Sequence, residues 1–211
     1  MKKIILVILL FAFTSAKAQN EKYIAAMQKN LEAYGNAKTA EDFLDLSNAF
    51  ERIAEAEKNQ WLAFYYAAHA QVIYGYLQKD MSVVDPIAEK SELLINKADV
   101  LEKNNSEISC VKSMIAQLRM IVNPMQRFQQ FGALATQLQE EAKKQDPTNP
   151  RPYALAAQNL FYTPAQFGGG CSSAKPVAEE GLKLLNTFQP KSALHPIWGK
   201  TQIEMVLGQC K

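Results

Sequence analysis

Few side chains in this sequence have the types and spacing that catalysis or metal binding requires. The two histidines, His69 and His195, lie far apart, and neither has a second His or a Cys at ligand spacing. The sequence contains no Gly-x-Ser-x-Gly and no His-Glu-x-x-His motif. The glycine run 168–170 lacks the preceding strand and following Gly-Lys-Ser/Thr of a phosphate loop, so it predicts a turn. No catalytic, cofactor-binding or metal-binding residue is therefore assigned, and a non-enzyme is expected.

The three cysteines could supply one covalent bond in an oxidising compartment. Cys171 lies at the start of one expected helix and Cys210 at the end of the next, so antiparallel packing of these helices brings the two thiols to the same end. Cys110 lies within a helix and is expected to be a buried thiol. The sequence allows a Cys171–Cys210 disulfide, and the alternative is three unpaired cysteines.

The N-terminus has the pattern of a secretory signal peptide. Two lysines precede the apolar stretch 4–13, and a small-x-small sequence ends at Ala18. The apolar stretch is too short for a membrane span, which needs roughly 20 residues. We therefore expect a signal peptide at 1–18 and a single mature domain at 19–211.

Loss of the signal peptide changes the charge of the protein. The signal holds three of the 23 basic residues, so the mature chain has 20 basic and 21 acidic residues and a formal net charge of −1. This balance gives no electrostatic basis for binding nucleic acid. No later stretch is apolar enough for a membrane span after signal cleavage. We expect a periplasmic protein, with secretion as the alternative.

The mature sequence predicts an all-α fold. It is rich in the helix formers Ala, Leu, Gln, Glu and Lys, and it lacks alternating β-branched runs and Asn-Gly or Asp-Gly hairpin turns. The expected helices span about 21–34, 40–58, 60–77, 86–103, 106–122, 125–144, 151–161, 173–187 and 195–209.

Self-similarity within the chain indicates repeated helical hairpins. Segments 86–96 and 176–186 share Pro, Ala, Glu, Leu and Asn at identical offsets, with a displacement of 90 residues. Asn59 and Asn149 have the same displacement, and Asn105 lies between them before another helix. A repeat of 20–50 residues is typical of a solenoid. The pattern predicts a period of about 45 and hairpins at about 59–104, 105–148 and 149–189, followed by a terminal helix at 195–209.

These repeats resemble the tetratricopeptide-repeat family. The family's unit has small residues at helix contacts and a late Ala-x-x-x-x-Pro, which Ala142 and Pro147 match; Ala98 has Lys103 in place of the proline. The resemblance covers about 60–211 and implies an α–α superhelix of stacked antiparallel hairpins, with a period longer than the family's 34. The sequence is also similar to small exported bacterial proteins with such repeats. It implies a binding scaffold and transfers no catalytic residue.

An aromatic helix and two equivalent polar positions suggest where a ligand could bind. The aromatic side chains between residues 61 and 76 surround one helix, which favours a buried core over an exposed groove. His69 and Asn159 each follow the first Asn of their hairpin by ten residues, so both could face one concave surface. Tyr65, His69 and Asn159 are the candidate groove residues.

Three functions compete at this point. The main hypothesis is an exported, non-enzymatic helical-repeat scaffold that binds a protein or peptide partner in the cell envelope, without a cofactor. The alternative is a periplasmic small-molecule-binding protein with its ligand between the helices, near the candidate groove residues. A hydrolase with an unrecognised site is the third, and no motif supports it.

Overall fold

The computed structural model describes residues 21–211, so the expected signal peptide at 1–18 lies outside the described residues. Within 21–211 the chain forms helices and turns without a β-strand, and the all-α fold class is confirmed. The first helix covers 21–36. The later helices are α2 (Ala40–Glu57), α3 (Trp61–Tyr76), α4 (Val84–Leu101), α5 (Ser106–Ile121), α6 (Pro124–Arg127), α7 (Ala133–Gln145), α8 (Arg151–Tyr162), α9 (Cys171–Thr187) and α10 (Lys200–Gln209).

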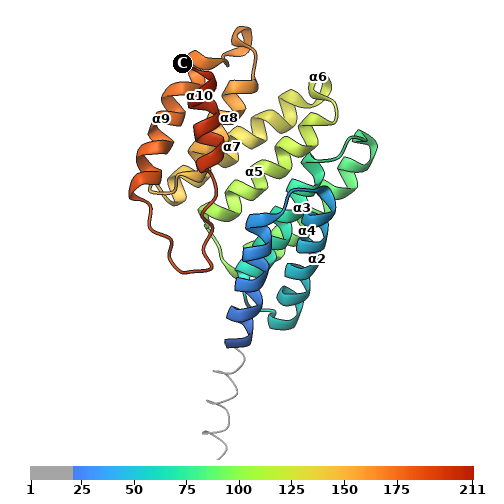
Figure 1. Cartoon of the computed structure of the whole chain (residues 1–211). Coiled ribbons are helices and arrows are strands. Elements are labelled where there is room, and N and C mark those ends of the chain that lie inside the picture. Colours follow the sequence, from blue (N-terminus) through green and yellow to red (C-terminus); the bar gives the residue numbers. More distant parts are fainter. Residues whose placement is uncertain (1–20) are drawn as a thin grey trace, which may run out of the picture.

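The helices pack in two layers along the chain (Figure 1). Helices α3, α5, α8 and α10 contact one another in sequence order and form the first layer. Helices α2, α4, α7 and α9 form the second layer, and α3–α4, α5–α7 and α8–α9 are the helical hairpins. These pairs lie within the residue ranges of the three expected hairpins. The 45-residue period and the tetratricopeptide-like superhelix stay predictions.

Local sequence signals explain most of the helix boundaries. Thr39 and Asp42 form a capping box at the start of α2. The Asn105 side chain accepts hydrogen bonds from the backbone N–H groups of Glu107 and Ile108, which begins α5 as a capped helix. A π-helical turn at Phe128–Gly132 interrupts the helix expected at 125–144.

The terminal helix expected at 195–209 begins later, at Lys200. Residues 188–199 are instead a non-helical segment that runs back toward α3 (Figure 1), and we name it the 188–199 segment. Leu194 and His195 are buried in this segment, and the Tyr66 hydroxyl donates to the Leu194 carbonyl at 3.0 Å. Gly199 then adopts a φ of +113°, which interrupts the helix. Long-range contacts with α3 therefore override the local helical pattern.

The core is centred on α3, which is buried on nearly all sides. Phe64, Tyr65 and Tyr66 are each at most 5% exposed, and the alanines of α3 are fully buried. A second, smaller core lies between α8, α9 and α10. Within residues 21–211, no helix has the length and hydropathy to cross a membrane.

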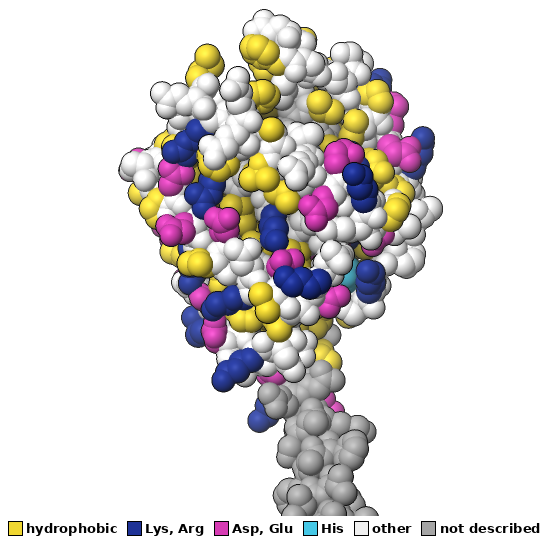
Figure 2. Space-filling view, turned by 180° about the vertical axis from the view of Figure 1, so that it is seen from behind, with side chains coloured by type: hydrophobic (Ala, Val, Ile, Leu, Met, Phe, Trp, Pro, Cys, Tyr) yellow, Lys and Arg dark blue, Asp and Glu magenta, His cyan; other side chains and the backbone are white. Residues whose placement is uncertain are grey.

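Acidic and basic side chains are interspersed over the face seen in Figure 2. Ion pairs in the described residues also join neighbouring helices, such as Arg119 with Glu92 at 2.6 Å and Arg127 with Asp85 at 2.7 Å. This face has no large single-sign patch of the kind that nucleic-acid-binding proteins use.

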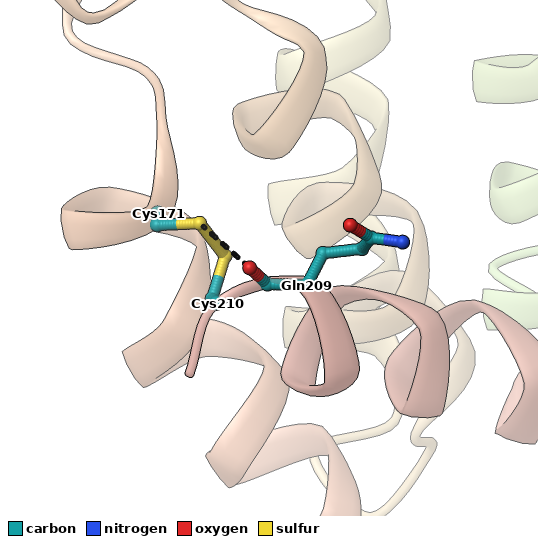
Figure 3. Close-up of a disulfide and its surroundings, with 3 residues drawn as sticks. All are labelled: Cys171, Gln209 and Cys210. Carbon is teal, nitrogen blue, oxygen red and sulfur yellow. Dashed lines mark hydrogen bonds between the residues drawn. A yellow bond between two sulfur atoms is a disulfide. The ribbon is translucent and has the colours of Figure 1, made fainter.

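Cys171 and Cys210 form a disulfide that closes the last helical pair (Figure 3). Cys171 is the first residue of α9, and Cys210 directly follows α10, with 5.2 Å between their Cα atoms. Cys110 is a buried free thiol in α5. The bond fastens α10, which packs mainly on α8 and α9.

Loss of this disulfide is expected to lower the free energy of unfolding by about 4 kcal/mol, because the bond closes a loop of 39 residues. Urea unfolding of the mature protein and of a Cys171→Ser/Cys210→Ser variant measures the difference. Alkylation in denaturant without reductant should label one cysteine, and reduction should add two labels. Three labels without reductant would exclude the bond.

Candidate functional site

A groove of about 410 Å³ opens on the face of α3, α5 and α8, with α10 at its edge; we name it the first-layer groove. Its volume falls within the range of small-molecule sites, roughly 300–1,000 Å³. Met114 and Leu155 form a buried apolar floor. Amide side chains lie among the remaining lining residues. The groove is lined by Ile73, Tyr76, Met114, Gln117, Met120, Ile121, Leu155, Gln158, Asn159, Tyr162 and Gln202.

A hollow of about 710 Å³ between the first helix and α2 is a poorer candidate. Its lining consists mostly of Asn, Asp, Arg and Ala side chains. Binding sites for small molecules are lined predominantly by hydrophobic and aromatic side chains, with a few polar groups that orient the ligand. The first-layer groove has that composition.

Helical periodicity positions the groove residues. Met114, Gln117 and Ile121 follow the spacing i, i+3, i+7 in α5, and Leu155, Gln158 and Tyr162 repeat it in α8. Residues at this spacing share one face of a helix. Tyr76 connects the walls, because its hydroxyl donates to the Met114 carbonyl at 2.8 Å. Three first-layer helices thus turn the same face toward one surface.

Of the three candidate groove residues, the structure places Asn159 in the groove lining and Tyr65 and His69 in the core beside it. Tyr65 is 0% and His69 4% exposed. His69 lies one helical turn before Ile73 on α3, so the buried residues adjoin the groove. Tyr65 and His69 stack with 5.9 Å between ring centroids and lie beneath Trp198 of the 188–199 segment.

Met114 is a groove residue that the sequence analysis did not single out. It lies 45 residues after His69 and 45 before Asn159, so the repeat period gives all three equivalent positions. The signal was present in the period that predicted the hairpins. The candidate groove positions were limited to polar residues, and Met114 is apolar.

A buried ion pair joins the first turns of α5 and α8, which lie before the groove-lining positions of both helices. Arg151 Nε donates to Glu107 Oε1 and Oε2 at 2.8 and 2.6 Å, and Asn149 Nδ2 donates to the same carboxylate at 2.9 Å. The Arg151 side chain is 0% exposed and stacks on Phe188, 4.4 Å from the ring centre. His195 lies 3.9 Å from Glu107. This network fixes the two helices whose faces form most of the groove.

Burial keeps both histidines neutral near pH 7. Desolvation and, to a smaller extent, the positive charge of Arg151 lower the pKa of His69 to about 3. The same two causes, desolvation first, lower the pKa of His195 to about 4. Among residues 21–211, no group of three or more His, Cys, Asp and Glu side chains is arranged to hold a metal ion.

His69 should make stability depend on pH. Its pKa is 6.5 when unfolded and about 3 when folded, so below pH 6.5 the unfolded state binds the additional proton. The unfolding free energy of the wild type should therefore fall relative to His69→Leu by about 1.4 kcal/mol per pH unit from pH 6.5 toward pH 4. Urea titrations at several pH values measure this gap. Phe50→Leu, a buried change in the same aromatic cluster, is the control. Its difference in unfolding free energy from the wild type should not change with pH. A pH-independent difference for His69→Leu would contradict the prediction.

A comparison with solved structures matches the HusA haemophore from Porphyromonas gingivalis, at 36% sequence identity and a TM-score of 0.81. The match covers 90% of this chain and 92% of that chain. The chain belongs to the HusA family. No protein-family model matches the chain, and a comparison with curated proteins finds no match.

Membership of the HusA family changes the ranking of the functional hypotheses. A haemophore is a protein that carries a small molecule, so the likeness to HusA favours the small-molecule alternative over the scaffold for a protein or peptide partner. It agrees with a non-enzymatic, all-helical protein. The likeness to HusA carries no information on a tetratricopeptide repeat.

Proposed function

We propose that this protein is exported and binds haem, or a closely related porphyrin, in the first-layer groove. The observation that carries the proposal is an apolar groove of ligand size in a chain of the HusA family. Haem is then the cargo of the protein. This proposal replaces the scaffold as the main hypothesis.

The groove has the two kinds of surface that a porphyrin needs. Ile73, Met120 and Ile121 are partly exposed in the groove and offer apolar contact to the flat macrocycle. Burial of apolar surface contributes about 25 cal/mol per Å². Covering even part of one porphyrin face therefore contributes strongly to the free energy of binding. The groove is open to solvent, which suits a carrier because part of the cargo stays accessible to an acceptor.

Polar side chains in the lining can orient the two carboxylates of the ligand. Gln117, Gln158 and Gln202 each carry an amide that can donate hydrogen bonds to a propionate. Gln202 lies in the first turn of α10, where the backbone N–H groups and the helix dipole favour negative charge. No Lys, Arg, Asp or Glu side chain is among the residues that line the groove. The ligand would therefore be held by amides and apolar contacts.

Titration of the mature protein with haemin and with metal-free protoporphyrin tests the proposal. Binding should be saturable for both compounds, with a shifted Soret band and quenched tryptophan fluorescence, because Trp198 lies beside α3. The ligand should also raise the melting temperature in a concentration-dependent manner. An apolar dye without a macrocycle serves as control. Porphyrin titrations that never saturate, or that match the dye, would contradict the proposal.

A further inference from the structure

The turns that close the three helical hairpins lie along one edge of the molecule. They follow the C-terminal ends of α3, α5 and α8, whose last residues, Tyr76, Ile121 and Tyr162, all line the first-layer groove. In Figure 1 these turns follow one another along the upper and right-hand side. We name this surface the turn edge; it comprises residues 77–83, 122–128 and 162–168.

Large apolar and aromatic side chains protrude from each of the three turns. Met125 is 95% exposed, Tyr162 68% and Phe167 66%, and Leu77 and Phe128 are exposed to a smaller extent. Among residues 21–211, six of the eleven exposed large hydrophobic side chains belong to these short turns, so they are concentrated there. Single exposed apolar residues are ordinary, whereas their accumulation on one surface marks an interaction site.

The turn edge is also poor in charge. Its charged residues are Lys79, Asp80 and Arg127, and Arg127 is paired with Asp85 at 2.7 Å. The turn at 162–168 has no charged residue. In Figure 2, the upper end of the molecule likewise shows mainly hydrophobic and uncharged side chains.

The opposite edge has the reverse composition. The connections that precede α3, α5 and α8 are 58–60, 102–105 and 146–150. They carry charged and amide side chains, and none of them contains a large apolar residue. The apolar side chains thus belong to one edge of the protein, as in proteins that meet an apolar phase in a fixed orientation.

The turn edge suits a lipid bilayer better than a protein partner. A specific protein interface needs a closely complementary surface of roughly 800 Å² on each side, and complementary charges help to select the partner. The interface of a bilayer adapts to side chains that protrude from separate turns, and it favours aromatic residues. Lys79 and Arg127 are no basic cluster of the kind that anionic headgroups attract, so a neutral bilayer is the expected surface.

We propose that the turn edge docks on the surface of a neutral lipid bilayer, with the side chains of Met125 and Phe167 inserted into its interface. The docking needs no ligand, so it goes beyond the proposed haem-binding function and does not depend on it. Tyr162 belongs both to the turn edge and to the lining of the first-layer groove. The docked protein therefore holds the groove beside the bilayer, where an apolar cargo can pass between the two without crossing bulk water.

Flotation of the mature protein with phosphatidylcholine vesicles tests the proposal. The wild type should bind saturably and equally at low and high salt, because salt screens ion pairs and leaves apolar insertion in place. Met125→Asp/Phe167→Asp should lower the partition coefficient by about a hundredfold, about tenfold for each inserted side chain. Circular dichroism checks that the variant is folded, and Met125→Gln/Phe167→Gln replaces it if it is not.

Leu93→Asp/Val100→Asp is the matched control. It introduces the same two charges at exposed apolar positions of α4, away from the turn edge, and should bind vesicles like the wild type. None of the four substituted residues lines the first-layer groove, so both variants should bind protoporphyrin normally in buffer without vesicles. That titration reports on the proposed function separately from the docking.

Three results would overturn the docking. The first is a wild type that does not float with the vesicles, and the second is an equal loss of binding in both double variants. The third is binding confined to anionic vesicles and lost at high salt, which would indicate ion pairing in place of apolar insertion. If the wild type ignores vesicles and Met125→Asp/Phe167→Asp converts a dimer into a monomer in sedimentation, a second copy of the chain covers the turn edge instead.

Discussion

Replacement of Arg151 by Met is expected to lower the free energy of unfolding by about 3–5 kcal/mol, because it leaves the Glu107 carboxylate buried without its charge partner. Both side chains are at most 4% exposed, so water cannot replace the lost interaction. The loss is a large part of the total stability of a domain, about 5–15 kcal/mol. Urea unfolding followed by circular dichroism measures the change.

A double-mutant cycle measures the coupling free energy between Glu107 and Arg151. Glu107→Leu should destabilise as strongly as Arg151→Met, because it leaves a buried guanidinium. The double variant should be far more stable than the sum of the single changes predicts, since replacing a whole buried pair by apolar groups removes both desolvation costs. Arg119→Met, which removes an exposed ion pair with Glu92, is the control and should cost at most about 1 kcal/mol. Single variants no more damaging than this control would contradict the prediction.

The sequence pattern reveals the helices on either side of this ion pair but not the pair itself. Asn105 marks the start of α5, and residue 151 was expected to begin a helix. The two charged residues are separated by 44 positions, close to the repeat period, which places them at similar heights on neighbouring first-layer helices. Charge alone would have favoured exposure for both, because Arg and Glu are almost never fully buried unless paired. Only the packing of α5 on α8 shows that they are paired.

Local signals predicted the fold class and most helix boundaries, since caps and breakers act over a few residues. They failed at the terminal helix, where residues 195–199 have a helix-compatible pattern but pack against α3 instead. Trp198 and His195 each contact aromatic rings of α3, more than a hundred residues earlier in the chain. Contacts at such separation leave no trace in a local window. The 188–199 segment is therefore the part of the fold that the sequence could not reveal.

The same segment explains the partial prediction of the site. The repeat period assigns His69, Met114 and Asn159 to one face of the first layer, and Met114 and Asn159 do line the groove. His69 has the same register but is covered, because the 188–199 segment returns over that end of α3. Periodicity identifies a common face; it does not reveal which part of that face another segment covers.

Ile121→Asp is expected to weaken binding of haemin and of metal-free protoporphyrin by about a hundredfold, a free-energy change of about 2.7 kcal/mol. Ile121 is partly buried at the end of α5 and lines the groove, so a carboxylate here would lose hydration against the apolar macrocycle. The folded protein without ligand should tolerate the change better than the complex, because the groove is open to water. Parallel titrations of both porphyrins, with urea unfolding of the unliganded variant, measure the two effects.

Equal losses for the two porphyrins are the distinguishing feature of this variant. A groove contact acts on the macrocycle, which both compounds share, whereas an iron ligand acts on haemin alone. Val100→Asp is the matched control: it introduces the same charge on α4, in the second layer, at a side chain that is 72% exposed. It should leave both affinities unchanged. If Ile121→Asp binds as tightly as this control, the porphyrin does not occupy the first-layer groove, and the site must be sought on another face of the protein.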